Sequence, residues 1–271
     1  MRRELGEDAT LLAGGTSVMV AAKLGLAELE QVIALGDVRE LYGISGDAVK
    51  GLRFGAMTTI REIETSHPVR EAAPGIAAAA HEVATVRIRN QATIGGNLVH
   101  ADPNQDLPPM LMVYDAVAHL SGEAGRREVP VADLFVDFFE TVVQSDEILV
   151  SVRVPPAPAD FRAGYLKFLP RTRDDYCTIA VAAGLRITDG VFRNVRIAIA
   201  GGAATPRRCV SAATSLEGQA ADESAIAAAG DLVLESVDPI SDGRGSARYK
   251  SEMARVCARR LLQSLVSEAR S

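Results

Sequence analysis

Two pairs of adjacent glycines each follow a short apolar run and precede a small polar residue. The first pair lies in Leu11–Ser17 (LLAGGTS) and the second in Thr93–Asn97 (TIGGN). Glycine has no Cβ, so its backbone N–H groups can approach a phosphate closely. One such pair by itself is more often an ordinary tight turn. Two pairs with the same framing predict a ligand with two phosphates, such as a dinucleotide.

The sequence offers few other groups that could do chemistry. It has no Gly-x-Ser-x-Gly elbow, and its four histidines, His67, His81, His100 and His119, have no metal-ligand spacing. Neither glycine pair continues into Gly-x-Gly-x-x-Gly or into the Gly-Lys-Ser/Thr of a nucleotide-hydrolysing loop. These patterns disfavour a hydrolase, a metal site, a Rossmann dehydrogenase and an NTPase.

The second glycine pair is followed by Ala101-Asp102-Pro103 and then by Asp106-Leu107-Pro108. Together with the first pair, these segments resemble the two flavin-binding loops in the FAD subunit of molybdenum hydroxylases. That subunit is the medium chain of the carbon monoxide dehydrogenase and xanthine dehydrogenase type, and the resemblance covers nearly the whole chain. It implies an α+β fold, with an FAD-binding domain of the vanillyl-alcohol-oxidase (PCMH) type over residues 1–156. A smaller α+β domain of the CO dehydrogenase flavoprotein type is expected over residues 157–271.

The resemblance also assigns the residues that bind FAD. Asp106 aligns with a family contact, although the pattern alone equally suits a carboxylate that caps a helix. Leu149 and Lys167 align with contacts to the isoalloxazine ring, although by pattern alone they read as a core residue and an outward-facing strand residue. A cation at Lys167 would stabilise the charge of a reduced flavin, and Tyr176 could shield one ring face. Two loops are expected to wrap the pyrophosphate and ribose: Leu12, Ala13, Gly14, Gly15, Thr16 and Ser17, and Thr93, Ile94, Gly95, Gly96 and Asn97.

The partners follow from the same resemblance. Substrate would be hydroxylated at a molybdopterin cofactor on a large subunit, and electrons would pass through [2Fe–2S] clusters of a small subunit to this FAD. They would then reach NAD⁺, O₂ or a quinone, within a dimer of heterotrimers. The three cysteines, Cys177, Cys209 and Cys257, are far apart and read as buried hydrophobes, so the clusters are expected on another chain.

Two other functions fit the same loops. The first is a free-standing FAD oxidase of this fold, in which His100, close to the second loop, could tether the flavin. The second is a scaffold subunit that has lost FAD, which the complete loops disfavour. The visible spectrum of the purified protein would distinguish these alternatives.

Composition limits the partners and the location. A net charge of −6 and a pI near 5.4 disfavour nucleic acid, which usually requires a basic face. No apolar run is long enough to span a membrane, and the N-terminus lacks a signal-peptide core, so a cytoplasmic chain is expected. Family members usually have about twenty residues before the first glycine loop, whereas eight precede the expected strand here. Either the start is misassigned or the first sheet has lost an edge element.

The glycine pairs must be positioned by strands and helices. Residues 9–13 predict a buried strand, and Thr16 or Ser17 is expected to cap a helix that continues to Leu24. Thr59 to Glu62 has capping-box spacing, and residues 74–84 predict a helix with proline in its first turn. If residues 85–92 are extended, Arg87 and Arg89 share a face, where they could hold a phosphate or simply be solvated.

The remaining elements are predicted from periodicity and from turn residues. Pro155 to Pro158 indicates an extended linker and a domain boundary. Asp189-Gly190 marks a turn between two strands. The last helix is expected to bury a stripe of Tyr249, Met253, Val256, Leu261 and Leu265. Strands are expected at 31–35, 49–57, 112–120, 147–154, 164–169, 178–187 and 191–200, and helices at 132–139 (a short patch), 221–236 and 247–268.

Overall fold

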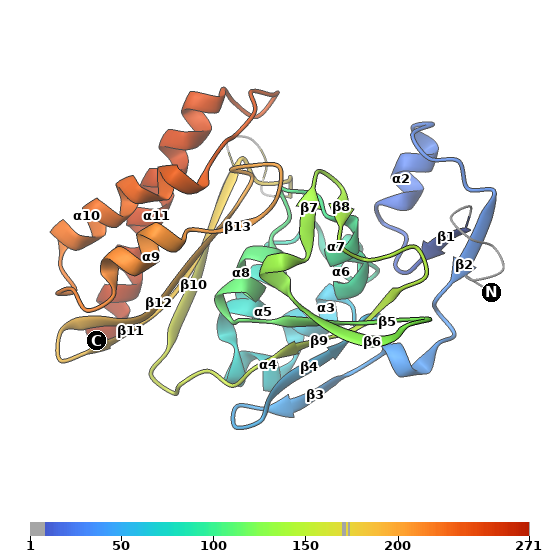
Figure 1. Ribbon diagram of the computed structural model, residues 1–271, viewed down its shortest axis with the longest axis horizontal. Helices are drawn as coiled ribbons and strands as arrows, with labels where there is room; N and C mark the ends of the chain where they lie inside the picture. Colours follow the sequence, from blue (N-terminus) through green and yellow to red (C-terminus); the bar gives the residue numbers. More distant parts are fainter. Residues whose placement is uncertain (1–8, 170–171, 173, 271) are drawn as a thin grey trace.

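The computed structural model describes residues 9–169, 172 and 174–270. The expectation about residues 1–8 lies outside this range. Three groups of elements follow one another along the chain: a two-stranded unit, a five-stranded sheet with short helices, and a four-stranded sheet covered by long helices (Figure 1). The mixture of helices and antiparallel sheets is the expected α+β fold.

The first unit carries the first glycine pair. Strands β1 (Ala9–Leu12) and β2 (Gln31–Ala34) are parallel, and helix α2 (Val18–Lys23) connects them. A short parallel pair needs such a crossover, which confirms the predicted order of strand, loop and helix. The strand is less buried than predicted, because only Ala9 is buried and Thr10 to Leu12 are half-buried. The predicted cap is wrong, because Ser17 occupies the N-cap position without a side-chain hydrogen bond.

The five-stranded sheet is antiparallel throughout, in the order β3-β4-β9-β5-β6. Pairing of β4 with β9 joins residues about one hundred positions apart, so this sheet forms only when the intervening helices have packed. Its strands are β3 (Ile44–Asp47), β4 (Gly51–Gly55), β9 (Ile148–Val154), β5 (Val117–Gly122) and β6 (Gly125–Pro130).

Short helices fill the segment between β4 and β5. The capping box of α3 is confirmed: Thr59 accepts a hydrogen bond from the Glu62 N–H, and the Glu62 carboxylate accepts one from the Thr59 N–H. The proline in the first turn of α5 is also confirmed. In order, these helices are α3 (Ile60–Thr65), α4 (His67–Ala72), α5 (Pro74–His81), α6 (Val86–Arg89), α7 (Ile94–His100) and α8 (Leu107–Val113).

Two predictions in this region are wrong. The strand expected over residues 112–120 begins only at Val117, because its first residues complete α8. The helical patch expected at 132–139 is a single 3-10 turn, η3 (Val131–Asp133), followed by a hairpin of β7 (Phe135–Asp137) and β8 (Glu140–Thr141). In both places short apolar runs fit either period, so the packing decided which element formed.

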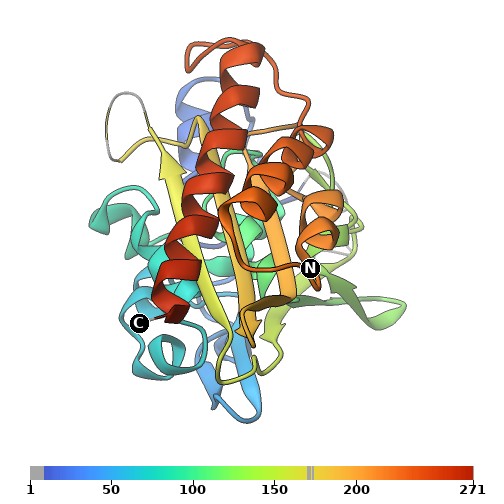
Figure 2. The ribbon, with the colours of Figure 1, turned by 90° about the vertical axis from the view of Figure 1, so that its left-hand side faces the viewer.

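The last sheet consists of β10 (Arg162–Phe168), β11 (Ile179–Thr188), β12 (Val191–Ala200) and β13 (Arg207–Arg208). The predicted turn is confirmed, since Asp189 and Gly190 both have positive φ, 53° and 73°, as a two-residue hairpin of type I′ requires. One face is covered by α9 (Val210–Leu216), α10 (Glu223–Leu232), η4 (Val233–Ser236) and α11 (Ala247–Arg270) (Figure 2).

The apolar face of α11 is broader than the predicted stripe. Leu261 and Leu265 are buried, but Tyr249 is 41% exposed. Helix α11 packs against both β11 and α10, so two sides of the helix are buried and its apolar face is wider than a single stripe. The buried residues of α11 in the second core cluster are Ala254, Cys257, Ala258, Leu261, Leu262, Leu265 and Val266. All three cysteines are free and buried, as expected.

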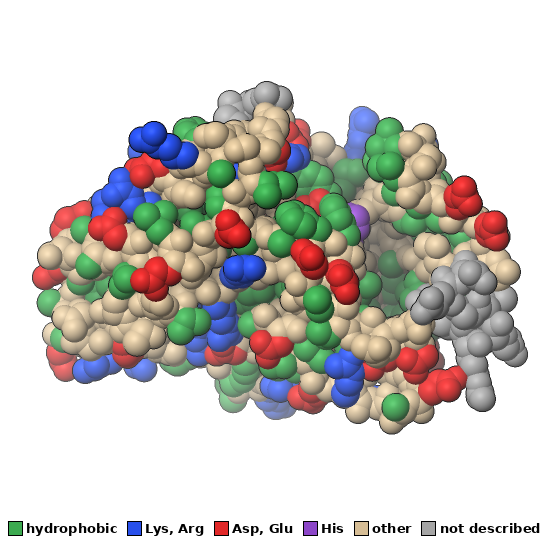
Figure 3. All heavy atoms as spheres, turned by 45° about the horizontal axis from the view of Figure 1, so that its top comes forward, with side chains coloured by type: hydrophobic (Ala, Val, Ile, Leu, Met, Phe, Trp, Pro, Cys, Tyr) green, Lys and Arg blue, Asp and Glu red, His purple; other side chains and the backbone are tan. Residues whose placement is uncertain are grey.

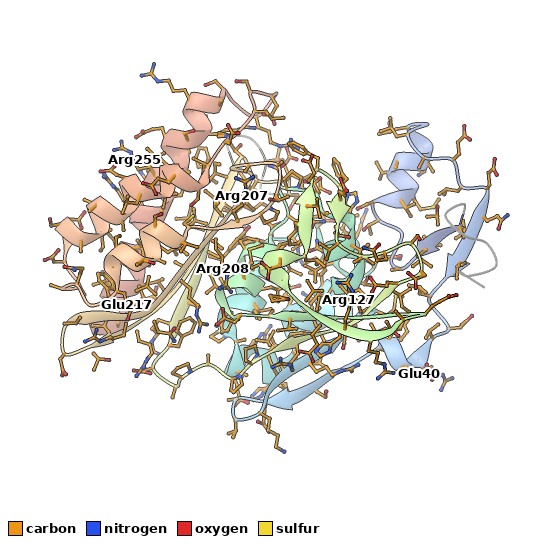
Figure 4. All side chains as sticks on the ribbon, viewed as in Figure 1. Glu40, Arg127, Arg207, Arg208, Glu217 and Arg255 are labelled. Atoms are coloured by element: carbon orange, nitrogen blue, oxygen red, sulfur yellow. The ribbon has the colours of Figure 1, made fainter. Side chains whose placement is uncertain are left out.

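Helix α8 links the two sheets. All seven of its residues are buried, and it contacts α5, β11 and β12. Arg196 donates to the carbonyl oxygen of Val113, Arg208 donates to that of Met112, and both guanidinium groups pair with Asp115. Figure 4 shows Arg208 reaching from the last sheet toward the centre of the molecule. Cations suit a helix C-terminus, where carbonyl groups lack partners, so these contacts fix α8 against the last sheet.

Candidate functional site

A cavity of about 430 Å³ lies between the β1–α2 unit and the helical segment. Figure 3 shows the molecule hollowed at this place. The structure brings both glycine segments to its wall, together with residues from β9 and from the segment before β11. Of the residues expected to bind FAD, the wall includes Ala13, Gly14, Gly15, Thr16, Ser17, Thr93, Gly95, Gly96, Asn97, Asp106, Leu149 and Tyr176, whereas Leu12, Ile94 and Lys167 do not line the cavity.

The first glycine pair presents free backbone donors. Within the described part of the chain, the N–H groups of Gly14, Gly15, Thr16 and Ser17 donate to no acceptor. Gly15 has a φ of +74°, which favours glycine, and a Cβ on Gly14 would lie 1.9 Å from the carbonyl oxygen of Gln91. Successive N–H groups in such a turn form a concave site for an anion, so this turn is suited to a pyrophosphate.

The second glycine pair is not a loop but the first turn of α7. Its N–H groups are all used within the protein: Gly95 donates to Ala56 O at 2.8 Å, and Gly96 donates to Thr93 Oγ1 at 3.1 Å. Ile94 and Asn97 likewise donate to backbone carbonyl groups. This turn therefore shapes the wall of the cavity but offers no free N–H donor to a ligand. A Cβ on Gly95 would lie 2.7 Å from the Ala56 Cβ, so glycine lets α7 pack directly against the residue that follows β4.

Two residues of the cavity wall, Asn97 and Gln105, each carry a side-chain oxygen without a partner among the described residues. Both oxygens, Asn97 Oδ1 and Gln105 Oε1, have almost no exposed area, so a ligand in the cavity meets them only when the amide turns. A buried polar atom without a hydrogen bond is unfavourable by about 1–3 kcal/mol, which favours such a turn toward a polar ligand. Either amide can turn its oxygen or its nitrogen to ribose hydroxyl groups. With the free N–H groups of the first turn, they fit the polar part of FAD.

Apolar side chains also line the cavity. They are those of Leu149, which is 5% exposed, and of Ile148, Val143 and Met57. Side chains of this kind suit the flat isoalloxazine ring of FAD. Glu147 also lines the cavity, and its carboxylate is held by two hydrogen bonds of 2.7 Å from Arg127 of β6. Figure 4 labels Arg127.

Tyr176 lies at the mouth of the cavity. It is 40% exposed, and the Arg244 guanidinium lies 5.9 Å from its ring centroid. Its hydroxyl lies next to the Ser17 side chain, which joins the first glycine turn to the segment before β11. Partial burial, with help from the charges of Asp102 and Asp106, raises the pKa of Tyr176, so the phenol stays neutral at physiological pH.

Asp106, Tyr165 and Lys167 form one buried network. The Tyr165 hydroxyl donates to Asp106 Oδ1 at 2.7 Å, and Lys167 Nζ lies 3.1 Å from Oδ2 and donates to the carbonyl oxygen of Glu82 at 2.8 Å. The alternative in which the Asp106 side chain caps α8 is wrong, since it makes no cap hydrogen bond. The outward-facing alternative for Lys167 is also wrong, because its side chain is 2% exposed. Lys167 therefore lies behind Asp106, and Asp106 faces the cavity.

The pKa of Asp106 is unusual. Burial raises it from the ordinary value of 3.8 to about 6, against the opposing effect of Lys167 and of the Tyr165 hydrogen bond. The folded chain therefore binds a proton at this carboxylate between pH 4 and 6, where the unfolded chain has released it. Such a group favours the folded state at low pH, and this contribution is lost as pH rises through about 6.

We expect the free energy of unfolding of the Asp106→Asn variant to differ from that of the wild type by an amount that depends on pH. The asparagine cannot take up a proton, so the loss of stability relative to the wild type should be greater at pH 4.5 than at pH 7.5, by about 1–2 kcal/mol. Urea unfolding of both chains at the two pH values measures this difference. A difference that is independent of pH would show that Asp106 titrates normally.

Arg87 and Arg89 are not extended. They belong to α6, where Arg87 is exposed and Arg89 is buried in an ion pair with Glu64. Neither lines the cavity, so both alternatives for Arg89, a phosphate contact and a solvated face, are wrong. The wall instead includes residues that carried no functional pattern, such as Met57, Val83 and Ala84. Gln105 could have been noticed as the neighbour of Asp106.

The cavity combines an anion site at a glycine turn, unpaired amide oxygens and an apolar wall, and the fold places a second sheet beside it. These features suit a dinucleotide cofactor such as FAD. A family model, the FAD binding domain in molybdopterin dehydrogenase, matches residues 1–157, and the CO dehydrogenase flavoprotein C-terminal domain matches residues 164–265. The chain belongs to this family of FAD-binding subunits, and it is an oxidoreductase subunit.

Individual relatives agree over nearly their whole length. The carbon monoxide dehydrogenase medium chain of Hydrogenophaga pseudoflava is 33% identical, over 96% of this chain and 90% of its own. The nicotine 6-hydroxylase medium subunit of Paenarthrobacter nicotinovorans is also 33% identical, over 94% and 89%. The solved carbon monoxide dehydrogenase from Hydrogenophaga pseudoflava that lacks the Mo-pyranopterin moiety of its molybdenum cofactor superposes with a TM-score of 0.95, at 34% identity over 98% and 92%.

Proposed function

We propose that this chain is the FAD-binding, electron-transferring subunit of a molybdenum-containing hydroxylase or dehydrogenase complex. The observation that carries the proposal is one cavity in which the free N–H groups of Gly14 to Ser17 share a wall with the unpaired oxygens of Asn97 and Gln105. A pyrophosphate and a ribose require these two kinds of group. The relatives named as medium chains or subunits support the assignment.

The roles of individual residues follow from their positions. The first glycine turn would bind the pyrophosphate, and Asn97 with Gln105 would bind hydroxyl groups. Leu149 would pack on the isoalloxazine ring, Tyr176 would limit access of water, and Lys167 would act through Asp106. The chemistry that FAD supplies when bound is the acceptance and release of one or two electrons.

The path of the electrons belongs to the same proposal. Electrons from substrate oxidation at a molybdopterin cofactor on a large subunit would pass through [2Fe–2S] clusters on a small subunit to this FAD, and then to an external acceptor. A dimer of heterotrimers in the cytoplasm, with a boundary between FAD-binding and C-terminal domains near residue 156, completes it. The two medium chains above come from enzymes with different substrates, so the substrate is a property of the partner.

A free-standing FAD oxidase remains the second candidate because His100 lines the cavity. Its ring lies 5.2 Å from that of Phe139, and burial lowers its pKa, which favours the neutral imidazole that a covalent link to a flavin would require. A covalent flavin would support this candidate. A flavin released by acid would support the subunit.

The test is purification of the chain alone and from its native host. We expect the isolated chain to bind about one FAD, released by acid, and to oxidise no organic substrate. We expect the chain from the host to co-purify with two further subunits and with molybdenum and iron. A colourless chain that gains no flavin from added FAD would refute FAD binding, and a monomer that oxidises substrate without molybdenum would refute the complex.

A further inference from the structure

The segment Glu82–Ala84 joins α5 to α6 and contributes Val83 and Ala84 to the cavity wall. All three of its carbonyl oxygens accept hydrogen bonds from buried cations. Lys167 Nζ donates to Glu82 O at 2.8 Å, and one nitrogen of Arg89, Nη1, donates to Val83 O at 2.9 Å and to Ala84 O at 2.8 Å. Three successive carbonyl groups are therefore directed to these cations.

The conformation of this turn is strained. Ala84 has a φ of +40°, a region that is unfavourable for alanine. Glycine would adopt it without that penalty. The two hydrogen bonds from one guanidinium nitrogen offset the strain, because hydrogen bonds from a charged donor are stronger than those between neutral groups. Without Arg89, both hydrogen bonds would be lost, and the turn is expected to relax to an unstrained conformation.

Arg89 is itself held in place. Its side chain is 9% exposed, and its Nε donates to Glu64 Oε2 at 2.8 Å. Glu64 also contacts His81 and Arg61. Burial disfavours the charged form of Glu64, but hydrogen bonds from His81, Arg61 and Arg89 outweigh it and lower its pKa to about 2. The carboxylate thus stays charged and keeps the guanidinium oriented at any physiological pH.

The direction of these carbonyl groups also determines the direction of the N–H groups in the same peptide units. In a trans peptide the N–H points opposite to the carbonyl group. Since Val83 O points at Arg89, the N–H of Ala84 points away from Arg89, and within the described part of the chain it donates to no acceptor. Ala84 lies on the cavity wall, so its N–H is placed to donate to an acceptor atom of a ligand there.

We propose that Arg89, oriented by Glu64, is a positioning residue for FAD: it holds the Val83–Ala84 turn so that this wall of the cavity keeps its shape and the Ala84 N–H is directed toward the cofactor. The inference rests on the proposed function, because it requires FAD in this cavity. Neither Arg89 nor Glu64 lines the cavity, so both act through the turn.

The experiment is titration of apo-protein with FAD, monitored by flavin fluorescence, in a set of matched variants. Arg89→Lys keeps the positive charge beside Glu64 but cannot reach both carbonyl oxygens, and it should weaken FAD binding roughly tenfold or more. Adding Ala84→Gly to Arg89→Lys removes the strain and should recover about fivefold of the affinity. Arg87→Lys, in the same helix but exposed, should bind FAD as the wild type does.

Recovery by Ala84→Gly would link the loss of affinity to the turn, because this change relieves strain at position 84 and restores none of the hydrogen bonds of Arg89. Wild-type affinity in Arg89→Lys would overturn the inference, as would a loss that Ala84→Gly fails to recover. If Arg89→Lys does not fold, Glu64→Gln is the second variant, because it removes only the negative charge that orients the guanidinium. It should also weaken FAD binding, and unchanged binding in this variant would overturn the inference. Absence of FAD binding by the wild type would instead refute the proposed function.

Discussion

Replacing Gly14 with alanine is expected to abolish FAD binding, because the added Cβ would lie 1.9 Å from the carbonyl oxygen of Gln91. The other close atoms, Gln91 C at 2.7 Å and Ala92 Cα at 3.1 Å, also belong to the backbone and cannot rotate away. The turn would have to move by more than 1 Å, which displaces the free N–H groups from the pyrophosphate. A misplacement of that size should weaken the affinity for FAD about 100-fold or more, because the hydrogen bonds to the pyrophosphate depend on exact distances.

The measurement is FAD titration combined with thermal unfolding of the apo-protein. The β1–α2 unit buries little apolar surface, since α2 has no buried residue, so the unfolding transition should change much less than the affinity. Gly36→Ala is the matched control, because no atom lies within 4 Å of its added Cβ. Gly95 is less suitable, since its Cβ would meet Ala56 and disturb the fold itself. Full flavin occupancy in Gly14→Ala would contradict a role for this turn.

Replacing Lys167 with methionine is expected to destabilise the apo-protein by about 3 kcal/mol at pH 7.5. Asp106 would remain buried beside an uncharged side chain, and Glu82 O would lose its donor. The carboxyl group should respond by keeping its proton to higher pH, so the pKa of Asp106 should rise above its already raised value of about 6. The loss of stability should therefore be smaller at pH 5, where Asp106 is protonated in both chains.

Urea unfolding at pH 5 and pH 7.5 measures both effects, and the double variant Lys167→Met with Asp106→Asn completes the cycle. Since the double variant contains no unpaired charge, it should be more stable at pH 7.5 than Lys167→Met alone. The effect on flavin potential should be small near neutral pH, because proton uptake by Asp106 replaces the lost positive charge. Unchanged stability of Lys167→Met at pH 7.5 would show that the ion pair contributes nothing.

Several features of the site could be predicted from the sequence because local geometry determines them. The Thr59 and Glu62 capping box and the Asp189-Gly190 hairpin involve residues a few positions apart. The first glycine pair likewise needs only its own strand and helix to form its turn.

The wrong predictions for Arg89 and Lys167 depended on distant contacts. From the sequence, Arg89 was expected at the surface or at a phosphate, but in the structure it is buried in an ion pair with Glu64, twenty-five positions earlier. Lys167 could have faced outward by its pattern, but in the structure it is buried against Asp106 at the start of α8. In each case an opposite charge was needed before a long polar side chain could be buried, and a single sequence does not show which charges meet.

The sequence by itself determined the class of the protein, because two glycine segments and the residues that flank them resemble those of one family of FAD subunits. Only the tertiary structure decided how each segment acts. The packing of α7 against Ala56 uses the N–H groups of its glycines, whereas the turn at Gly14 and Gly15 leaves its own free. The difference arises because a hydrogen-bond donor is available to a ligand only when no acceptor of the fold reaches it first, and those acceptors come from other parts of the chain.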